Sequence, residues 1–599
     1  MKKDVVIVGS GCAGFAAADR LLNFGITDIV LLTEGKNCGT SRNTGSDKQT
    51  YYKADLTLSG DSIIKMAESI YEGGGVDGEK AVIEAVNSLR CFYTLEEYGL
   101  DFPKGDYGEY IGYKTDHDDS VRATSLGPLT SKKMTEALEK SASGKGLQII
   151  DNSLAVKICT KENNVFGIIY LDLQTNVLNY IETACVILAV GGSAAVYKDV
   201  VYPPSQHGSL SLALDCGCRL QNITEWQYGI ASTDFRWNLS GSYQQIVPRY
   251  VSVDKNGNEY EFLDNYISGD VFDLTFLKGC EWPFDSKKVN ASSQIDLAVL
   301  EEIKKGRQVF LDYRKNPKGF KLNENSAAFE FWKKNEIIGN TPYERLCALN
   351  KKAADLYKAH NIDLSREKLR IAVCAQHCNG GAKVDINFET DIKGLFAIGE
   401  ASGNFGVYRP GGTALNSTQV GALRAAQKIS RDIKKYRINN NFCDFDDLIK
   451  SEQEFLDNHI EVEENIISVS EYFKSQFSKY AGIIRDVNEI KRLKSELKEY
   501  LDGSKTVAVP SKLYAKLLYS CYDMIKTQYA LAVSILDSYE SLGSRGGSVT
   551  KKGSFNIDEK PDSKEFIVES DYNKASLIKR KPIIIKEYLF EKYIQQEKK

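Results

Sequence analysis

The sequence predicts an α/β protein built in three parts, and three observations support this expectation. Short apolar runs that end in glycine-rich turns occur at the N-terminus and again near residue 400, which is typical of strands in a buried parallel sheet. A loop-rich stretch with many aromatic residues separates these runs. Long amphipathic helical patterns extend from about residue 444 to 539. With 599 residues, the chain also exceeds what one hydrophobic core supports.

The expected boundaries lie where these patterns change. Residues 1–225 and 367–435 are expected to form two segments of one parallel-sheet domain, 226–366 an inserted α+β capping domain, and 436–599 a helical C-terminal domain that ends in a short strand and a basic tail. Inside the first segment, residues 103–130 are expected to be a loop, and residues 148–190 a β-meander that returns into a buried strand.

The composition argues against several classes of function. Lys plus Arg number 77 and Asp plus Glu number 81, so the net charge of −4 gives no support for nucleic-acid binding. There is no apolar stretch long enough for a membrane span and no signal-peptide pattern, so a cytoplasmic protein is expected. The 13 cysteines lack C-x-x-C spacing, and we expect no disulfide, iron–sulfur cluster or other metal site.

A dinucleotide-binding fingerprint occupies the first thirty-four residues. A strand at 5–8, a glycine-rich turn, a helix to about residue 23 and a second strand at 29–32 follow one another in the required order. The glycines permit the tight turn, the approach of a pyrophosphate and close helix–strand packing, and the helix N-terminus favours phosphate. A terminal acid accepts hydrogen bonds from a ribose diol, which favours FAD or NAD over NADP. The residues concerned are Gly9, Gly11, Cys12, Ala13, Gly14 and Glu34.

The polar loop at 36–53 leaves the strand that carries this acid, so we expect it to line the cofactor rather than to be a solvent-exposed connection. Its candidate contacts are Ser41, Arg42, Asn43, Thr44 and Ser46.

Five motifs together resemble the succinate dehydrogenase/fumarate reductase flavoprotein family, which includes L-aspartate oxidase. They are the fingerprint at 9–34, AVGGSA at 189–194, GSLSLALDCGCRLQNITE at 208–225, the return segment at 377–425 and ESLGSRGG at 540–547. The resemblance implies FAD as cofactor, a Rossmann-like FAD-binding domain made from the N-terminal and return segments, and an inserted capping domain that helps to enclose the substrate.

The resemblance also implies the remaining site residues. Backbone amides at 411–414 can hold the flavin ring, Glu400 its ribityl hydroxyls, and a helix starting near Ser417 its N1/C2 edge. Arg409 and His377 match the family's substrate-orienting pair, with His377 as hydrogen-bond donor. The further cofactor contacts are Ala155, Val156, Ala189, Gly191, Gly192, Gly399, Gly411, Gly412, Thr413, Ala414 and Leu415.

The substrate side departs from the family pattern. The capping-domain arginine that delivers a proton in fumarate reductases is missing, and Ser292 or a neighbour occupies its place. EWQYGIAST lacks the family's histidine, and Gln244-Gln245 replaces its Thr-Glu pair. Fumarate, succinate and aspartate are therefore weakened as substrates. Arg236, Tyr243 and Arg249, with Tyr228 a weaker candidate, are the groups we expect to orient the substrate or transfer protons instead.

The sequence thus predicts an FAD-dependent oxidoreductase that moves a hydride between flavin N5 and a small polar organic substrate, with an electron-transfer protein as a further candidate partner. Two alternatives stay open. One is a true flavoprotein subunit of fumarate reductase or succinate dehydrogenase, and the other is a flavin electron-transfer subunit of a larger complex.

The FAD is predicted to be non-covalent, because GTSRNTGS at 39–46 has no counterpart of the histidine that attaches FAD in the respiratory enzymes. Acid precipitation of the purified yellow protein should leave the flavin in the supernatant, measured by its absorbance. Flavin that remains with the precipitate would contradict this prediction.

Overall fold

The computed structural model describes residues 1–55, 60–437, 445–461 and 465–585. Its centre is a five-stranded parallel sheet in the order β19-β10-β1-β2-β6. The strands are β1 (Val5–Val8), β2 (Ile29–Leu32), β6 (Gln148–Ile150), β10 (Cys185–Leu188) and β19 (Leu395–Ala397). The α/β class and the Rossmann-like sheet are therefore confirmed, and the late strand at 395–397 closes the sheet as the return segment was expected to do.

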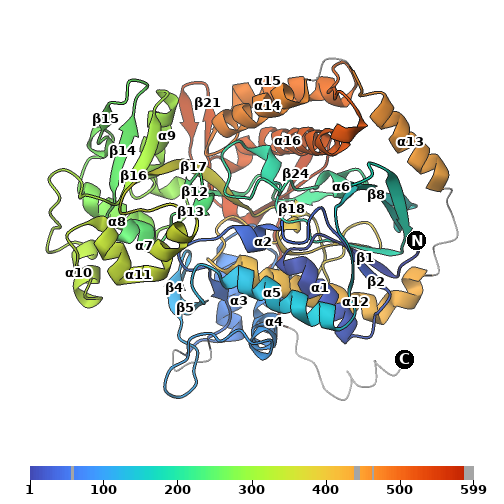
Figure 1. The fold of residues 1–599 in the computed structure, drawn as a ribbon, viewed down its shortest axis with the longest axis horizontal. Helices are drawn as coiled ribbons and strands as arrows, with labels where there is room; N and C mark the ends of the chain where they lie inside the picture. The colour runs from blue at the N-terminus through green and yellow to red at the C-terminus, as the bar shows by residue number, and fades with distance from the viewer. Residues whose placement is uncertain (56–59, 438–444, 462–464, 586–599) are drawn as a thin grey trace.

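Local sequence explains the first βαβ unit. Every residue of β1 and β2 is buried, as their apolar runs require. Gly9 has a φ of +107°, a conformation that suits glycine, and α1 (Cys12–Asn23) follows directly. Helix α1 packs against α5 (Thr130–Gly144) and α12 (Thr413–Arg437) beside the sheet (Figure 1). Helix α12 begins four residues before the expected position.

The predicted meander is partly wrong. An antiparallel sheet contains β7 (Ser153–Lys161), β8 (Asn164–Asp172) and β9 (Leu178–Glu182), but Gln148–Ile150 pairs in parallel with β2 instead of joining it. Three apolar residues do not encode which neighbour they pair with, so sequence alone placed this strand in the wrong sheet.

The inserted part is built on a six-stranded antiparallel sheet, in the order β13-β12-β17-β16-β14-β15. Figure 1 shows this sheet with its helices on the left of the molecule. The strands are β12 (Trp226–Ser232), β13 (Trp237–Asn238), β14 (Arg249–Val253), β15 (Glu259–Tyr260), β16 (Gln308–Asp312) and β17 (Leu369–Cys378). The helices are α7 (Ser242–Gln245), α8 (Val271–Cys280), α9 (Gln294–Lys304), α10 (Ala327–Lys334) and α11 (Pro342–Ala359).

Strand β17 connects the two parts of the site. It begins the expected return segment, yet it pairs with β12 and β16 of the inserted part. Its register places His377 opposite Gln227. The last residues of β17 therefore lie at the seam between the capping sheet and the FAD-binding part.

The C-terminal part is mainly helical, as expected, with α13 (Phe445–Asp457), α14 (Ile466–Tyr480), α15 (Val487–Leu501) and α16 (Ala515–Leu542). It also adds more strand than expected. Strands β20 (Ile484–Asp486), β21 (Val549–Lys552) and β22 (Phe555–Ile557) form one sheet. Strands β23 (Phe566–Ser570) and β24 (Ala575–Lys579) join β11 (Leu220–Gln221) and β18 (Gly381–Ala382) in another.

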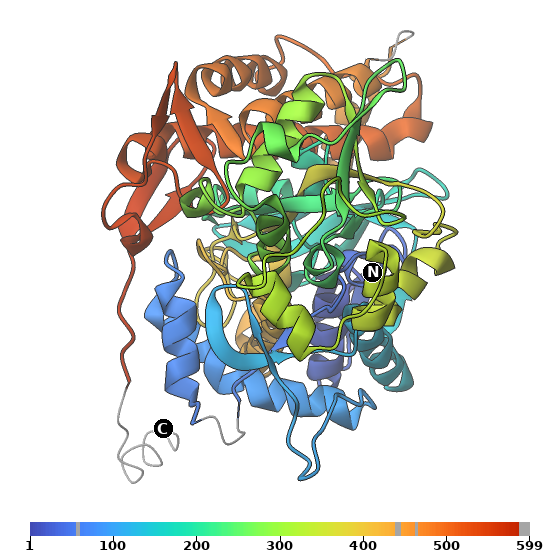
Figure 2. The same cartoon turned by 90° about the vertical axis from the view of Figure 1, so that its left-hand side faces the viewer.

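After β24 the chain runs down beside α3 (Ile63–Glu72) and α4 (Gly78–Glu97), as Figure 2 shows. Lys581 exchanges two hydrogen bonds with residues 77 and 78 there. The last part of the expected basic tail, 586–599, lies outside the described residues.

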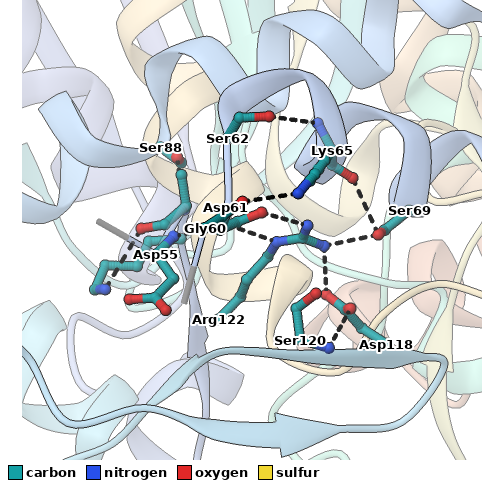
Figure 3. A network of polar contacts seen from close by, with 12 residues as sticks. Asp55, Gly60, Asp61, Ser62, Lys65, Ser69, Ser88, Asp118, Ser120 and Arg122 are labelled. Atoms are coloured by element: carbon teal, nitrogen blue, oxygen red, sulfur yellow. Dashed lines mark hydrogen bonds and ion pairs between the residues drawn. The ribbon is translucent and has the colours of Figure 1, made fainter. Parts of the chain in front are cut away.

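The expectation of a loop at 103–130 is also wrong in part, because β4 (Tyr113–Thr115) and β5 (Asp118–Thr124) form a hairpin that pairs with β3 (Tyr51–Tyr52). A buried network anchors the hairpin (Figure 3). The Arg122 guanidinium, 1% exposed, donates to both Asp61 oxygens at 2.6 and 2.9 Å and to Asp118 at 2.8 Å. The turn of this hairpin carries Asp116.

Arg122→Met should destabilise the protein strongly, because it keeps most of the apolar stem but leaves two buried carboxylates without their cation. Breaking such a pair costs about 3–5 kcal/mol. Arg219→Met is the matched control, since Arg219 pairs with Asp391 and Glu569 while 48% exposed, where the loss is about 0–1 kcal/mol. Urea unfolding should separate the two variants, and equal midpoints would contradict this account.

Candidate active site

A cavity of about 680 Å³ opens at the carboxyl ends of the parallel strands, and Val8, Leu32, Ala189 and Ile398 line it there. This is the edge at which open α/β sheets bind ligands, and the volume lies in the usual range of about 300–1,000 Å³ for ligand sites. The cavity extends to the end of β17 and to the β4–β5 hairpin, so three parts of the fold enclose it.

Most of the expected cofactor contacts line this cavity. They are Gly9, Gly11, Cys12, Ala13, Glu34, Ser41, Thr44, Ser46, Ala155, Ala189, Gly191, Glu400, Gly411, Gly412, Ala414 and Leu415. The others do not line it: Gly14, Arg42, Asn43, Val156, Gly192, Gly399, Thr413 and Ser417.

The residues outside the cavity have other contacts. A Cβ on Gly14 would lie 1.9 Å from the Gly9 carbonyl oxygen, so this glycine serves helix–strand packing. The Arg42 guanidinium pairs with Glu139 and lies 3.9 Å from Glu136. Both carboxylates are on α5, which packs beside the loop. Asn43 donates to the backbone carbonyls of residues 37 and 39. Arg42 and Asn43 thus have protein partners and lie outside the cavity wall, where the loop was expected to contact the cofactor.

The lining residues fit FAD. The N-cap residue of α1, Gly11, has no side chain, and the first turn of the helix has no acid, which favours a bound phosphate there. Ser41 Oγ accepts the Cys12 N–H at 3.1 Å at the same helix end. A Cβ on Gly11 would meet only Ser41 Oγ, at 3.4 Å, so the space beside this glycine belongs to the cavity. At the far end, Glu34 lies 2.8 Å from Lys516 Nζ and 4.0 Å from His207 Nε2, and the buried hydroxyl of Thr40 has no hydrogen-bond partner in the described residues.

Glu400 is held between the cofactor residues and β17. Its carboxyl accepts the Cys378 N–H at 2.8 Å and a hydrogen bond from Tyr202. Burial raises the pKa of Glu400 to about 7, although these hydrogen bonds and Arg409 favour the charged form. Its position on the cavity wall suits the hydroxyl groups of a ribityl chain.

Arg409 is the cationic group of the other end of the cavity. Its guanidinium donates to Thr413 Oγ1 at 3.3 Å, while its buried Nε has no hydrogen-bond partner in the described residues. Burial lowers the pKa of Arg409 to about 10, against the effect of Glu400 and Asp116. The side chain, which lines the cavity, therefore stays charged at neutral pH, and its buried Nε lacks an acceptor in the described residues.

His377 does not have the hydrogen-bonding role that was expected of it. Asn379 Nδ2 donates to the Val407 carbonyl at 3.4 Å, so Asn379 Oδ1 accepts from His377 Nδ1 at 2.9 Å. Burial and the charge of Arg409 lower the pKa of His377, which favours the neutral ring. With the proton on Nδ1, the buried Nε2, which has no partner in the described residues, presents a lone pair and accepts rather than donates.

The three expected cap residues do not line the cavity. Arg249 is buried among Glu259, Glu261 and Asp312, which pair with its guanidinium. Arg236 donates to the Tyr202 carbonyl at 2.8 Å, and the buried hydroxyl of Tyr243 donates to the Ala353 carbonyl at 3.0 Å. The capping part supplies the partners of Arg249 and Tyr243, and the FAD-binding segment supplies the partner of Arg236, which proximity in sequence could not reveal.

The weaker candidates also lie elsewhere. Tyr228 donates to the Tyr197 hydroxyl at 2.9 Å, and Ser292 donates to Glu281. Neither residue lines the cavity.

Several polar groups at the substrate end were missed. Gln376 Oε1 accepts the Trp282 indole N–H at 2.7 Å, which leaves Gln376 Nε2 buried without a partner in the described residues. Asp116, Gln227 and Trp282 also line the cavity, as does Gln245, which the sequence had placed at the family's Thr-Glu pair. The position of Gln376 next to His377 could have indicated that it lies in the site. No such sequence signal was available for Asp116, which lies in a stretch expected to be a loop.

Within the described residues, no helix is both long and apolar enough to cross a membrane, and no group of three or more His, Cys, Asp or Glu side chains is arranged to hold a metal ion.

A glycine-rich turn, an acid after the second strand and an arginine line one cavity, which is the arrangement expected of a flavin-dependent enzyme. The family model of the FAD binding domain matches residues 4–415, and the chain belongs to this family. It is 23% identical to an uncharacterised FAD-dependent oxidoreductase of Methanocaldococcus jannaschii, covering 91% of this chain and 93% of the relative. It is 24% identical to one subunit of the fumarate reductase (CoM/CoB) of Methanothermobacter marburgensis, covering 70% of this chain and 71% of that relative.

Among solved structures, a quinol–fumarate reductase with menaquinol molecules matches with a TM-score of 0.74 at 19% identity, over 98% of this chain and 99% of that one, and this likeness shows the fold. The protein is thus an FAD-dependent oxidoreductase of the fumarate reductase, succinate dehydrogenase and L-aspartate oxidase type, as its motifs predicted.

Gly11→Val should abolish FAD binding without unfolding the protein, because the added side chain would occupy cavity space rather than clash with backbone. Gly144→Val is the control, since a Cβ at Gly144 meets nothing within 4 Å. Flavin content and the circular dichroism spectrum measure the two effects. A Gly11→Val protein loaded with FAD as fully as the control would overturn the assignment of this cavity.

Proposed function

We propose that the protein moves a hydride between flavin N5 of non-covalent FAD and a small organic substrate that carries an anionic group and a neighbouring hydrogen-bond donor. The observation that carries this proposal is the pairing of Arg409 and His377 on the cavity wall that also holds the cofactor residues. The Arg409 guanidinium is positively charged, and its Nε donor has no acceptor in the described residues. The Nε2 acceptor of His377 likewise has no donor there. Together they recognise both groups of such a substrate.

Each residue has a separate task in this proposal. FAD, when bound, supplies the hydride acceptor or donor. The Arg409 guanidinium holds the anionic group, and its low hydration in a half-buried position strengthens that bond. His377, fixed in one tautomer by Asn379, accepts the substrate's hydrogen bond and sets its orientation. Gln376 Nε2 offers a further donor next to the pair.

The lining of the cavity supports a substrate other than fumarate or succinate. Within the described residues, Arg409 is the one arginine that lines it, so no second arginine is present to deliver a proton. The polar and cationic substrate end favours an enzyme over a simple electron carrier. An electron-transfer protein is still proposed as partner, since one relative is a fumarate reductase subunit.

Arg409→Lys should slow flavin reduction or reoxidation by the substrate about 10- to 100-fold, because lysine cannot reproduce the planar fork and a charge-assisted hydrogen bond is worth about 1.5–3 kcal/mol. His377→Gln should cost less, since its amide oxygen can still accept. Both variants should retain FAD. Stopped-flow absorbance of the flavin, with a substrate found by flavin bleaching and with an artificial dye, measures the effect.

Arg249→Lys serves as control, because Arg249 pairs with carboxylates away from the cavity. Variants at 409 and 377 that are slow with substrate but normal with dye support the proposal. If both variants react normally with substrate and with dye, Arg409 and His377 do not bind the substrate that reacts with the flavin, and the electron-carrier alternative is favoured.

A further inference from the structure

Asp116 lies between two cavities. It lines the cofactor cavity together with Arg409 and His377, and it also lines a second cavity of about 610 Å³. The two cavities share residues from two segments, 115–119 of the β4–β5 hairpin and 280–283 after α8. Asp116 is half-buried, so part of its surface remains available along this shared wall.

Asp116 is held in place by two hydrogen bonds, one to its side chain and one to its backbone. Its Oδ1 accepts the Trp282 backbone N–H at 3.0 Å, and its carbonyl accepts the Gly411 N–H at 3.0 Å. A Cβ built on Gly411 would lie 3.3 Å from Asp116 Oδ2, so this oxygen lies against the turn that follows Arg409. The carboxyl is therefore fixed near Arg409. Its Oδ1 is hydrogen-bonded to Trp282, and its Oδ2 lies close to Gly411.

We propose that Asp116 is the catalytic carboxyl that exchanges a proton with the substrate, and that the second cavity connects this carboxyl with solvent. This inference rests on the proposed function. Reduction of a substrate double bond adds one hydride, supplied through the flavin, and one proton. The proton leaves the Asp116 carboxyl, which becomes a carboxylate and regains a proton from water in the second cavity. Oxidation runs in reverse, with the carboxylate as base.

The electrostatic surroundings suit this exchange. Burial raises the pKa of Asp116 to about 7, although the Trp282 N–H and the charges of Arg409, Lys278 and Lys288 favour the carboxylate. A carboxyl that titrates near neutral pH can both give and accept a proton. The titratable or charged groups that act on it or line the second cavity come from α3, the hairpin, α8 and the segment after it, the turn before α12, and the segment before β23: Glu72, Tyr113, His117, Asp118, Asp119, Lys278, Cys280, Glu281, Asp285, Lys287, Lys288, Tyr408, Arg409 and Lys564. On the cofactor side, the same cavity as Asp116 is also lined by Asp47, Lys48, Lys114, His377 and Glu400.

The second cavity provides a polar path outward. Glu281 and Lys288 line it and lie 3.1 Å apart, with side chains 32% and 35% exposed. Lys287, also on its wall, is 45% exposed. Protons can therefore reach Asp116 through water and charged groups without crossing the cofactor cavity.

The test uses the FAD-loaded full chain and two probes. In single turnover between pH 5.5 and 9, dye-reduced enzyme is reoxidised by fumarate at saturating concentration, which serves as a slow unsaturated probe and not as the proposed substrate. The wild-type rate should fall above about pH 7, where Asp116 loses its proton. Asp116→Asn should be slower by ~10²–10⁴-fold and lack this limb, since general-acid assistance is lost. Asp116→Glu should restore the fall in rate at high pH. Asp106→Asn, at an exposed position before β4, should behave as wild type.

Malonate binding, followed by flavin absorbance, is a readout that needs no turnover. The wild-type Kd should rise above about pH 7, because the Asp116 carboxylate repels the anion near Arg409, and this rise should be smaller in Asp116→Asn, where only the ionisation of Glu400 remains. An Asp116→Asn protein that keeps the wild-type pH dependence with malonate overturns the proposal, as does an unchanged fumarate rate. If Arg409→Lys changes neither the rate with fumarate nor the Kd of malonate, while the pH dependence due to Asp116 persists, the proposed function fails instead.

Discussion

The close packing of α1 on the turn after β1 is the constraint on which the rest of the site depends. Gly14 rests on the Gly9 carbonyl, where a Cβ would lie 1.9 Å away, and this contact aims the helix N-terminus into the cavity. Strands β10 and β19, more than 170 and 380 residues later, add to the same sheet edge and bring their own turns to the ligand. One local contact thereby organises distant segments around a phosphate-binding position.

A second, long-range contact builds the substrate end. The antiparallel pairing of β12 with β17 joins the capping sheet to the FAD-binding part and places His377, Gln376 and Gln227 on the cavity wall. Arg409 then approaches from the turn before α12. Glu400 and Asp116, in their ionised forms, offset part of the cost of burying this half-buried arginine.

The same surroundings divide the chemistry among residues with different charge states. Burial favours the neutral form of His377 and of the carboxyls at 400 and 116, while Arg409 stays cationic. The proposed anionic substrate would therefore meet the Arg409 cation together with neutral acceptors and donors. Proton exchange is assigned to a carboxyl on a separate hairpin, which a second cavity links to the surface.

The sequence by itself determined the parts that depend on short-range patterns. Gly9, Gly11 and Glu34 indicate the βαβ unit and its cofactor, and the apolar runs at 185–188 and 395–397 indicate buried strands, because hydrophobic periodicity and glycine spacing are properties of neighbouring residues. Only the tertiary structure decided which partner each charged side chain meets. Arg42 and Arg249 turn to carboxylates of α5 and of the capping sheet, whereas Asp116 reaches the cavity because a hairpin forms where a loop was expected. Such pairings join residues far apart in the chain, and no local pattern encodes them.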